Sequence, residues 1–229
     1  MEETIFLRNS KNNCCFYVLF ETLFCDLSEI KNSKSTIINS LKKLSTEKNI
    51  SKLSSDVDIL RKSIEGNKAF DQEDFFVYLK KISEIIQKED MESFLKLYGI
   101  YVNNNNYCSK NITPESYFFP LTYDEVKLID FKNKPKYIIF GLDQLVEKKI
   151  PLTFYFDKDE YELNSMVFHL GDHNGGHWYC YKKDNSGNWY YCNNILEKKI
   201  KMNSLNISSM PKISIYKKIT KNSNPNKNQ

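Results

Sequence analysis

The chain has 229 residues, enough for one domain or at most two small ones, and 41% hydrophobic and 14% aromatic residues supply a core. Its 33 basic and 29 acidic residues leave a net charge of +4, too small and too evenly spread to indicate nucleic-acid binding. No run of about 18 apolar residues occurs, so we expect no membrane-spanning helix and no membrane partner.

The most apolar N-terminal run, from Cys14 to Phe24, does not read as a signal peptide. Glu21 interrupts it, and Asp26 follows without the small residues of a cleavage site. We therefore expect a cytoplasmic protein, in a host cytosol if the source is a parasite, symbiont or virus. In such a reducing compartment the six cysteines, which form no CxxC pair, are buried apolar groups or include one reactive thiol.

The first half of the chain, to about residue 100, has apolar residues at the spacing of amphipathic helices. The segments with this pattern are Cys15–Phe24, Ile37–Leu44, Leu60–Ile64, Phe75–Ile86 and Met91–Tyr98. We expect the last of these helices to end at Gly99, because glycine is the usual residue just past a helix end.

The second half, from about residue 115, is rich in short β-branched and aromatic runs. The predicted strands are Tyr137–Phe140, Thr153–Phe156, Leu163–His169, His177–Lys183, Trp189–Cys192 and Ile213–Tyr216. The turn-forming residues 184–187 predict a hairpin between two of them. Helices followed by antiparallel strands indicate an α+β domain spanning 1–219, and the polar residues 220–229 predict a disordered tail.

All three histidines, His169, His173 and His177, fall within nine residues. Three glycines in the same stretch make a helical metal site improbable and favour a strand, a loop and a second strand. Two other interpretations stay open for this segment alone. One is a zinc site that adds Cys180 or Cys192, and the other is a surface loop with incidental histidines.

Three residues have the chemistry of a cysteine nucleophile with its base and orienting group. Cys14 begins an apolar helix, where the N-terminus favours a thiolate. Gly175 and Gly176 precede His177 and would let another backbone approach it. Asn193 ends the strand expected to pair with that of His177, so the two side chains can meet. Both Cys14 and its neighbour could instead be small core residues, as most free cysteines are.

Two segments resemble the sequence boxes of the ubiquitin-specific proteases. Residues 7–21 are similar to the cysteine box, Leu-x-Asn-x-Gly-x-x-Cys-Tyr-x-Asn-x-x-x-Gln, and residues 161–193 are similar to the histidine box. The matching positions of the second box are Tyr161, Leu163, His169, Gly171, Gly175, Gly176, His177, Tyr181, Trp189 and Asn193. The resemblance implies a papain-like α+β fold, in which a helical thumb of about 1–100 packs on an antiparallel palm of about 115–219.

The resemblance also implies a role for each candidate residue. Cys14 is expected to be the nucleophile, His177 the general base and acid, and Asn193 the group that orients the imidazole. Asn9, five residues before the cysteine, matches the asparagine that stabilises the oxyanion.

The implied activity is that of a deubiquitinase, which hydrolyses the bond after the C-terminal glycine of ubiquitin or a ubiquitin-like protein through a thioester. Gly175, Gly176 and Trp178 are the expected substrate-binding residues. We expect a monomer with no cofactor and no metal, and with the zinc-bearing fingers reduced or absent, since no CxxC pair occurs.

The chain departs from the family pattern at several positions. Lys11 stands where glycine is usual, Glu21 where glutamine is usual, and Cys15 and Trp178 where tyrosines are usual. Lys11, Glu21 and the missing fingers motivate a first alternative, a catalytically impaired protein that binds ubiquitin. A second alternative is another hydrolase with a Cys–His–Asn arrangement that acts on an unrelated amide.

Overall fold

The structure is a computed structural model. It describes residues 13–24, 33–46, 50–65, separate positions between 75 and 89, 98–100, 136–141, 150–156, 158–172, 175–193, 200–201, 205 and 211–219. The predicted tail 220–229 and residues 101–135 lie outside the described residues. The domain limits and the reduction of the fingers therefore stay predictions.

The helical half begins with α1 (Cys14–Leu19), which continues as one π-helical segment, η1 (Phe20–Phe24). Every residue of α1 is buried, as the unbroken apolar run predicts. Two amphipathic helices follow, α2 (Thr36–Thr46) and α3 (Ile50–Glu65), and the described positions between 75 and 88 are helical as well. The predicted helices in these regions are confirmed, and α2 and α3 extend past the predicted ends.

The second half forms a mostly antiparallel sheet in the order β1-β2-β8-β4-β5-β6-β7, with β3 paired to β4. The strands are β1 (Tyr98–Ile100), β2 (Tyr137–Gly141), β3 (Thr153–Phe156), β4 (Asp159–Asp172), β5 (Gly175–Lys183), β6 (Trp189–Cys192), β7 (Ile200–Lys201) and β8 (Ile213–Lys218). All six predicted strands are present, and β4 is longer than its predicted segment at both ends.

One predicted helix is wrong at its end. Tyr98 and Gly99, expected to close the helix from Met91, instead belong to β1, which pairs in parallel with Tyr137 and Ile138 of β2. Pairing with a distant strand overrides the local pattern here, since an aromatic and a β-branched residue flank the glycine. Residues 91–97 lie outside the described residues.

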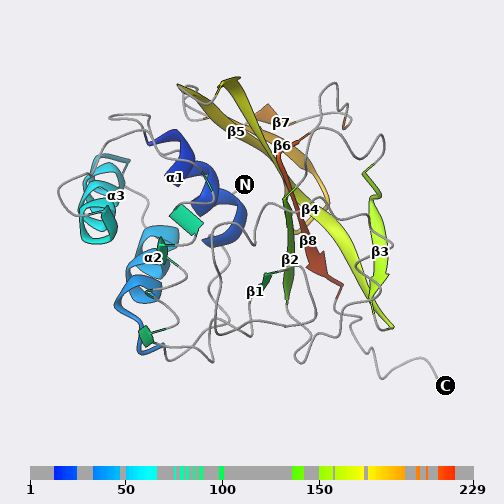
Figure 1. Ribbon diagram of the computed structural model, residues 1–229, viewed down its shortest axis with the longest axis horizontal. Helices are drawn as coiled ribbons and strands as arrows, with labels where there is room; N and C mark the ends of the chain where they lie inside the picture. Colours follow the sequence, from blue (N-terminus) through cyan, green and yellow to red (C-terminus); the bar gives the residue numbers. More distant parts are fainter. Residues whose placement is uncertain are drawn as a thin grey trace.

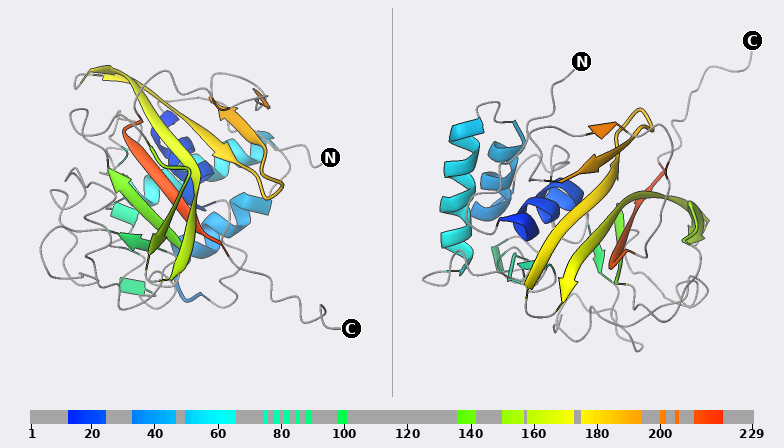
Figure 2. Two further views of the ribbon diagram at one scale, coloured as in Figure 1. Left: turned by 90° about the vertical axis from the view of Figure 1, so that its right-hand side faces the viewer. Right: turned by 90° about the horizontal axis from the view of Figure 1, so that it is seen from above.

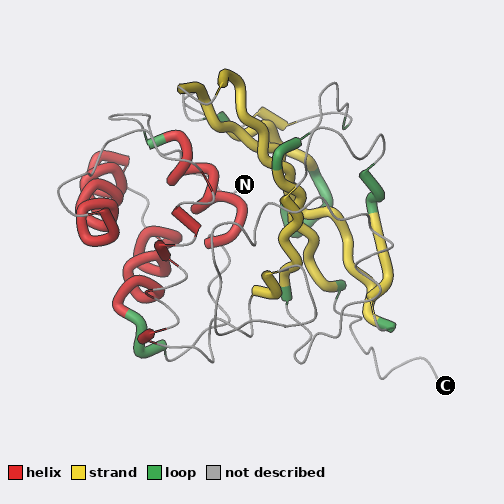
Figure 3. Tube along the Cα trace, viewed as in Figure 1, coloured by secondary structure: helices red, strands yellow, loops and turns green. Residues whose placement is uncertain are grey.

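The helices cover one face of the sheet, with α1 between the sheet and the other two helices (Figures 1 and 2). Alternate residues of β5 point to opposite faces. Trp178 and Cys180 join the core shared with the helices, whereas Tyr179 belongs to an aromatic cluster on the other face, with Phe168 and Phe154. Figure 3 shows the same division into a helical side and a strand side.

The hairpin between β5 and β6 turns at residues 184–187, as predicted. The carboxylate of Asp184 accepts hydrogen bonds from the backbone N–H groups of Ser186 (2.9 Å) and Asn188 (2.8 Å). Gly187 has a φ of +85°, which glycine adopts without strain. This turn sets the register of β5 and β6 and thereby the relative positions of the residues at their far ends.

Among the described residues, no helix has the length and apolar character needed to cross a membrane.

Candidate active site

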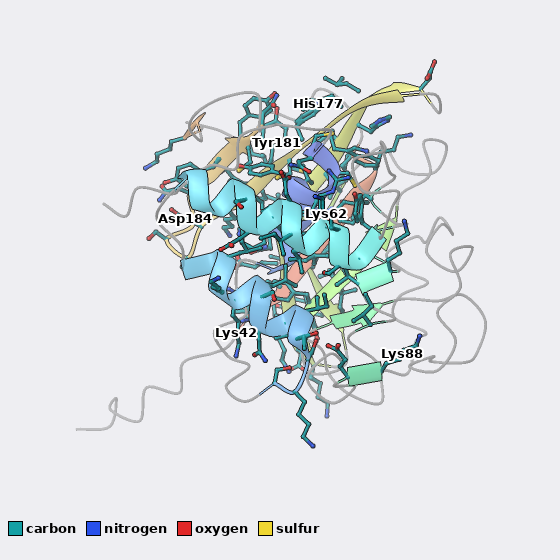
Figure 4. All side chains as sticks on the ribbon, turned by 90° about the vertical axis from the view of Figure 1, so that its left-hand side faces the viewer. Lys42, Lys62, Lys88, His177, Tyr181 and Asp184 are labelled. Atoms are coloured by element: carbon teal, nitrogen blue, oxygen red, sulfur yellow. The ribbon has the colours of Figure 1, made fainter. Side chains whose placement is uncertain are left out.

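Cys14 is the first residue of α1, and this helix packs on β5. Cys14 as a residue is only 4% exposed, and its thiol lies within hydrogen-bonding reach of the His177 side chain. The structure therefore brings together two residues that are 163 positions apart in the chain (177 minus 14). In Figure 4, His177 lies at one end of β5, and Asp184, just past the other end, marks the turn.

Asn193 supplies the next contact, because its Oδ1 lies 2.9 Å from Nε2 of His177. The two residues are not directly opposite. Cys180 pairs with Cys192, so the position facing Asn193 on β5 is that of Tyr179, and His177 lies two residues further along. Diagonal neighbours of this kind share one face of a sheet and are within reach of long side chains. The predicted meeting of His177 and Asn193 is thus observed, with this diagonal offset.

The pKa of Cys14 is lowered by its neighbours. Burial by itself would raise it, but the hydrogen bond with His177, the backbone N–H groups of Trp178 and Cys15, and the charge of His177 outweigh that effect. Each of these groups stabilises the thiolate rather than the thiol. The sequence pattern did not indicate the contribution of the Trp178 N–H, which follows from the closeness of α1 to the start of β5.

The pKa of His177 is raised. The largest cause of this increase is the hydrogen bond with Cys14. Burial lowers the pKa, whereas the hydrogen bond to Asn193 and the charge of Cys14 raise it further. The shifts of Cys14 and His177 therefore have opposite signs, as expected for a thiolate beside an imidazolium. A thiol activated by an imidazole, which a third group orients, is an arrangement suited to nucleophilic catalysis.

A buried cluster behind Cys14 was missed by the sequence reasoning. Asn13 occupies the N-cap position of α1, yet its side chain makes no capping hydrogen bond. Its Oδ1 instead accepts a hydrogen bond from Nη1 of Arg61, and its Nδ2 donates to Oδ1 of Asp58 (3.3 Å). Arg61 is fully buried and its guanidinium lies over the ring of Tyr78. Helix α3 thus fixes the residue that precedes the thiol.

Tyr191 is a second residue that the sequence did not single out. Nδ2 of Asn193 donates a hydrogen bond to the hydroxyl of Tyr191 at 2.7 Å. The two residues are two positions apart, so their side chains leave the strand on the same face. A tyrosine two residues before a candidate orienting asparagine is the only sequence signal for this contact.

The three predicted substrate-binding residues have different surroundings. Trp178 is 4% exposed and packs against Phe75 and His169, so its side chain has little surface for a substrate. Gly176 has an internal reason to be glycine, because a Cβ there would lie 2.3 Å from the side chain of His169. Gly175 opens β5 and pairs with Asp172. A substrate contact at either glycine stays a prediction.

Three other residues that the sequence singled out lie outside the described residues. These are Asn9, Lys11 and His173. Among the described residues, no group of three or more His, Cys, Asp or Glu side chains is placed to hold a metal ion.

Glu21, which stands where the family has glutamine, is buried in η1, and its backbone carbonyl accepts a hydrogen bond from Nζ of Lys182 at 2.6 Å.

Comparison with known protein sequences gives two matches. Residues 5–216 match the family model described as ubiquitin carboxyl-terminal hydrolase. A curated relative, ubiquitin carboxyl-terminal hydrolase 25 of Arabidopsis thaliana, is 28% identical over 154 residues, which cover 62% of this chain and 23% of that protein. The chain therefore spans about a quarter of the length of this relative.

Solved structures show the same fold. The SAGA Ubp8/Sgf11/Sus1/Sgf73 DUB module bound to ubiquitin aldehyde has a TM-score of 0.62 and 12% identity, over 95% of this chain and 70% of that one. An essential yeast splicing factor has a TM-score of 0.58 and 14% identity, over 94% and 69%. The predicted papain-like α+β fold is confirmed, and because one fold can support different functions, it does not by itself establish an activity.

Proposed function

The chain belongs to the ubiquitin carboxyl-terminal hydrolase family, and from this premise we propose that it is a cysteine-type deubiquitinase. Its substrate is the peptide or isopeptide bond after the C-terminal glycine of ubiquitin or a ubiquitin-like protein. The observation that carries the proposal is the continuous contact from the Cys14 thiol to His177 and from His177 to Asn193.

In the proposed reaction, His177 takes the proton of the Cys14 thiol and the thiolate attacks the carbonyl carbon of the glycine. The new C–S bond leaves a negative charge on the carbonyl oxygen, which the amide of Asn9 and the backbone N–H of Cys14 would stabilise. The imidazolium then protonates the departing amine, and a thioester remains. Water, deprotonated by His177, hydrolyses this thioester and restores the thiol.

The partner follows from the family and from one structural relative. The DUB module with the same fold is bound to ubiquitin aldehyde in its own structure, which supports ubiquitin or a ubiquitin-like protein as the partner of this chain. We further propose that the protein acts as a monomer in the cytoplasm and needs no cofactor. The direct route from thiol to imidazole supports the last point, since the proposed steps use only side chains and water.

A ubiquitin-binding protein without activity is the second candidate. It is motivated by Lys11 and Glu21, which depart from the cysteine box. The lowered pKa of Cys14 and the oriented imidazole argue for the enzyme, because a binding protein needs neither.

The test is incubation with ubiquitin that carries an electrophile at its C-terminus, followed by mass spectrometry. We expect a covalent adduct that is lost in Cys14→Ala and kept in Cys15→Ala, a buried neighbour of the same type. Tight binding without an adduct would favour the ubiquitin-binding protein. Indifference to ubiquitin and to a panel of ubiquitin-like probes would favour a hydrolase for another amide.

A further inference from the structure

We propose that Tyr191 is a positioning residue for the imidazole of His177, which it holds through the side chain of Asn193. The inference rests on the proposed function and adds a residue that acts behind the expected triad. It assigns Tyr191 no contact with substrate or with the reacting atoms.

The geometry joins three side chains in a row. One end of the Asn193 carboxamide, Oδ1, lies 2.9 Å from Nε2 of His177, and the other end, Nδ2, lies 2.7 Å from the hydroxyl of Tyr191. A carboxamide is planar and has one accepting and one donating end. Fixing its donating end therefore also fixes the direction of its accepting end.

The direction of that accepting end decides what His177 can do. An imidazolium has N–H groups at both ring nitrogens, so Nε2 needs an acceptor such as Oδ1 of Asn193. A turned carboxamide would place Nδ2 against this N–H and would disfavour the charged ring. With Nε2 donating to Oδ1, the other ring nitrogen is left to exchange a proton with the Cys14 thiol. Tyr191, by accepting from Nδ2, stabilises the productive direction.

The hydroxyl of Tyr191 is itself held by packing. The ring centroid of Tyr191 lies 5.6 Å from that of Tyr179 and 5.4 Å from that of Tyr181. The backbone of Tyr191 pairs with Tyr181 on β5 and with Ile200 on β7. A tyrosine has few rotatable bonds, so a packed ring fixes its hydroxyl closely. The aromatic cluster on the outer face of the sheet thereby connects to the predicted active site.

The first experiment is Tyr191→Phe, which removes the hydroxyl and keeps the ring. With a fluorogenic ubiquitin substrate, we expect kcat to fall about three- to tenfold, the effect of losing one hydrogen bond of ordinary strength, while KM changes little. Tyr190→Phe is the matched control. It also removes a tyrosine hydroxyl with a hydrogen-bond partner, Asp184, but this side chain packs against the opposite core, so kcat should be unchanged. An unchanged kcat in Tyr191→Phe would overturn the proposal.

A double-mutant cycle distinguishes positioning through Asn193 from general support of the sheet. In an Asn193→Ala background the carboxamide is gone, so Tyr191→Phe should cause no further loss of kcat. If the second substitution lowers kcat as much in this background as in the parent, Tyr191 acts by another route and the proposal fails.

A readout that needs no activity is the titration of the His177 imidazole, followed by NMR. The hydrogen bond that His177 donates to Asn193 raises the pKa of His177, so a loosened Asn193 in Tyr191→Phe should move this pKa downward. The His177→Ala variant identifies the resonance among the three histidines. If the parent protein reacts with no modifier probe, the proposed function fails, and the titration still decides whether Tyr191 acts on His177. An unmoved titration would overturn the inference.

Discussion

His177 and Asn193 are in contact although they do not face each other across the hairpin. The register places Tyr179 opposite Asn193, and the 2.9 Å contact between Nε2 and Oδ1 spans a diagonal of two residues. A diagonal contact depends on side-chain reach more than on backbone position. Its strength is therefore sensitive to anything that holds or loosens the Asn193 carboxamide, whereas the proposed proton transfer is made by His177 itself.

We predict that His177→Ala lowers turnover more than Asn193→Ala. Losing the general base should cost about 10²- to 10⁴-fold in kcat. Losing the orienting carboxamide removes one hydrogen bond to a charged ring and should cost about 10- to 100-fold. Single-turnover rates with a fluorogenic ubiquitin substrate measure both. Equal residual rates in the two variants would contradict the assigned division of roles.

The reactivity of Cys14 should depend on pH in a way that reports its partner. In the parent protein the pKa of Cys14 is lowered, so its thiolate is populated at pH values below those at which an ordinary cysteine ionises. His177→Ala removes the hydrogen bond and the positive charge but leaves the burial, which raises the pKa. We therefore expect the midpoint of alkylation by iodoacetamide to move to higher pH in this variant.

The control for this measurement is Cys14→Ser, which should remove the fast phase of alkylation. Cys180 should react slowly, because burial raises the pKa of its thiol, whereas the pKa of Cys14 is lowered. A pH midpoint that is the same with and without His177 would show that the imidazole does not stabilise the thiolate.

The sequence predicted the parts of the molecule that depend on local pattern. Amphipathic spacing indicated α2, and aromatic runs with turn residues between them indicated the β5–β6 hairpin. The ends of this hairpin indicated that His177 and Asn193 could meet, and the family resemblance placed Cys14 with them. The sequence could not predict β1, because Tyr98 becomes a strand only by pairing with a segment about forty residues later (137 minus 98).

The supporting contacts of the site were beyond the sequence for a similar reason. Arg61 is a charged residue in an amphipathic helix, and such a residue is usually solvated. Its burial follows from the placement of α3 beside the start of α1, where Asn13 offers an acceptor. Tyr191 is one of fifteen tyrosines, and only the strand register shows which of their hydroxyls meets Asn193.

Substituting Arg61 should destabilise the protein markedly. Arg61→Met keeps much of the apolar stem and removes the guanidinium, so Asn13 loses a charged hydrogen-bond donor in a buried place. We expect the free energy of unfolding to fall by roughly 2–4 kcal/mol, from the lost charged hydrogen bond and lost packing. Urea denaturation measures this loss. The exposed neighbour Lys62→Met should change the free energy of unfolding by no more than about 0.5 kcal/mol.

Glu89 should make stability depend on pH in the acid range. Its carboxylate accepts hydrogen bonds from the Ser35 hydroxyl (2.7 Å) and from the Thr36 N–H (2.8 Å) at the start of α2. The bond from Ser35 is the largest cause of its lowered pKa, which burial opposes. Because the folded-state pKa is lowered, the stabilisation is complete above the unfolded pKa and is lost as pH falls through the folded value.

We therefore expect Glu89→Gln to lower the free energy of unfolding by about 1 kcal/mol or less at neutral pH, a small value because solvent screens the site. The difference from the parent should shrink below about pH 4, where the parent carboxylate also becomes protonated. Urea denaturation at several pH values measures it, with Glu160→Gln in β4 as a control away from any helix end. A difference that stays constant down to pH 3 would contradict the assigned cause.

Gly176 and Gly187 lie near opposite ends of β5, and alanine should act on them by different mechanisms. At Gly176 a Cβ would lie 2.3 Å from the carbonyl oxygen of Leu170, a backbone atom that no side-chain rotation can move. At Gly187 a Cβ would meet nothing closer than Lys183 Cε at 3.8 Å, and the only cost is the positive φ of +85°. We expect Gly176→Ala to lower the free energy of unfolding by about 1–3 kcal/mol, as overpacking does, and Gly187→Ala by about 1 kcal/mol.

Turnover should separate the two variants further. Relief of the clash at Gly176 must push β5 away from β4 immediately beside His177. We therefore expect kcat to fall even at temperatures where the Gly176→Ala variant is fully folded. Gly187 lies in the turn, beyond the far end of β5 from His177, and its variant should keep the parent kcat at temperatures where it is folded. Equal kcat values in the two folded variants would contradict this prediction. They would show that the strand around Gly176 relaxes without moving the imidazole of His177 away from Cys14.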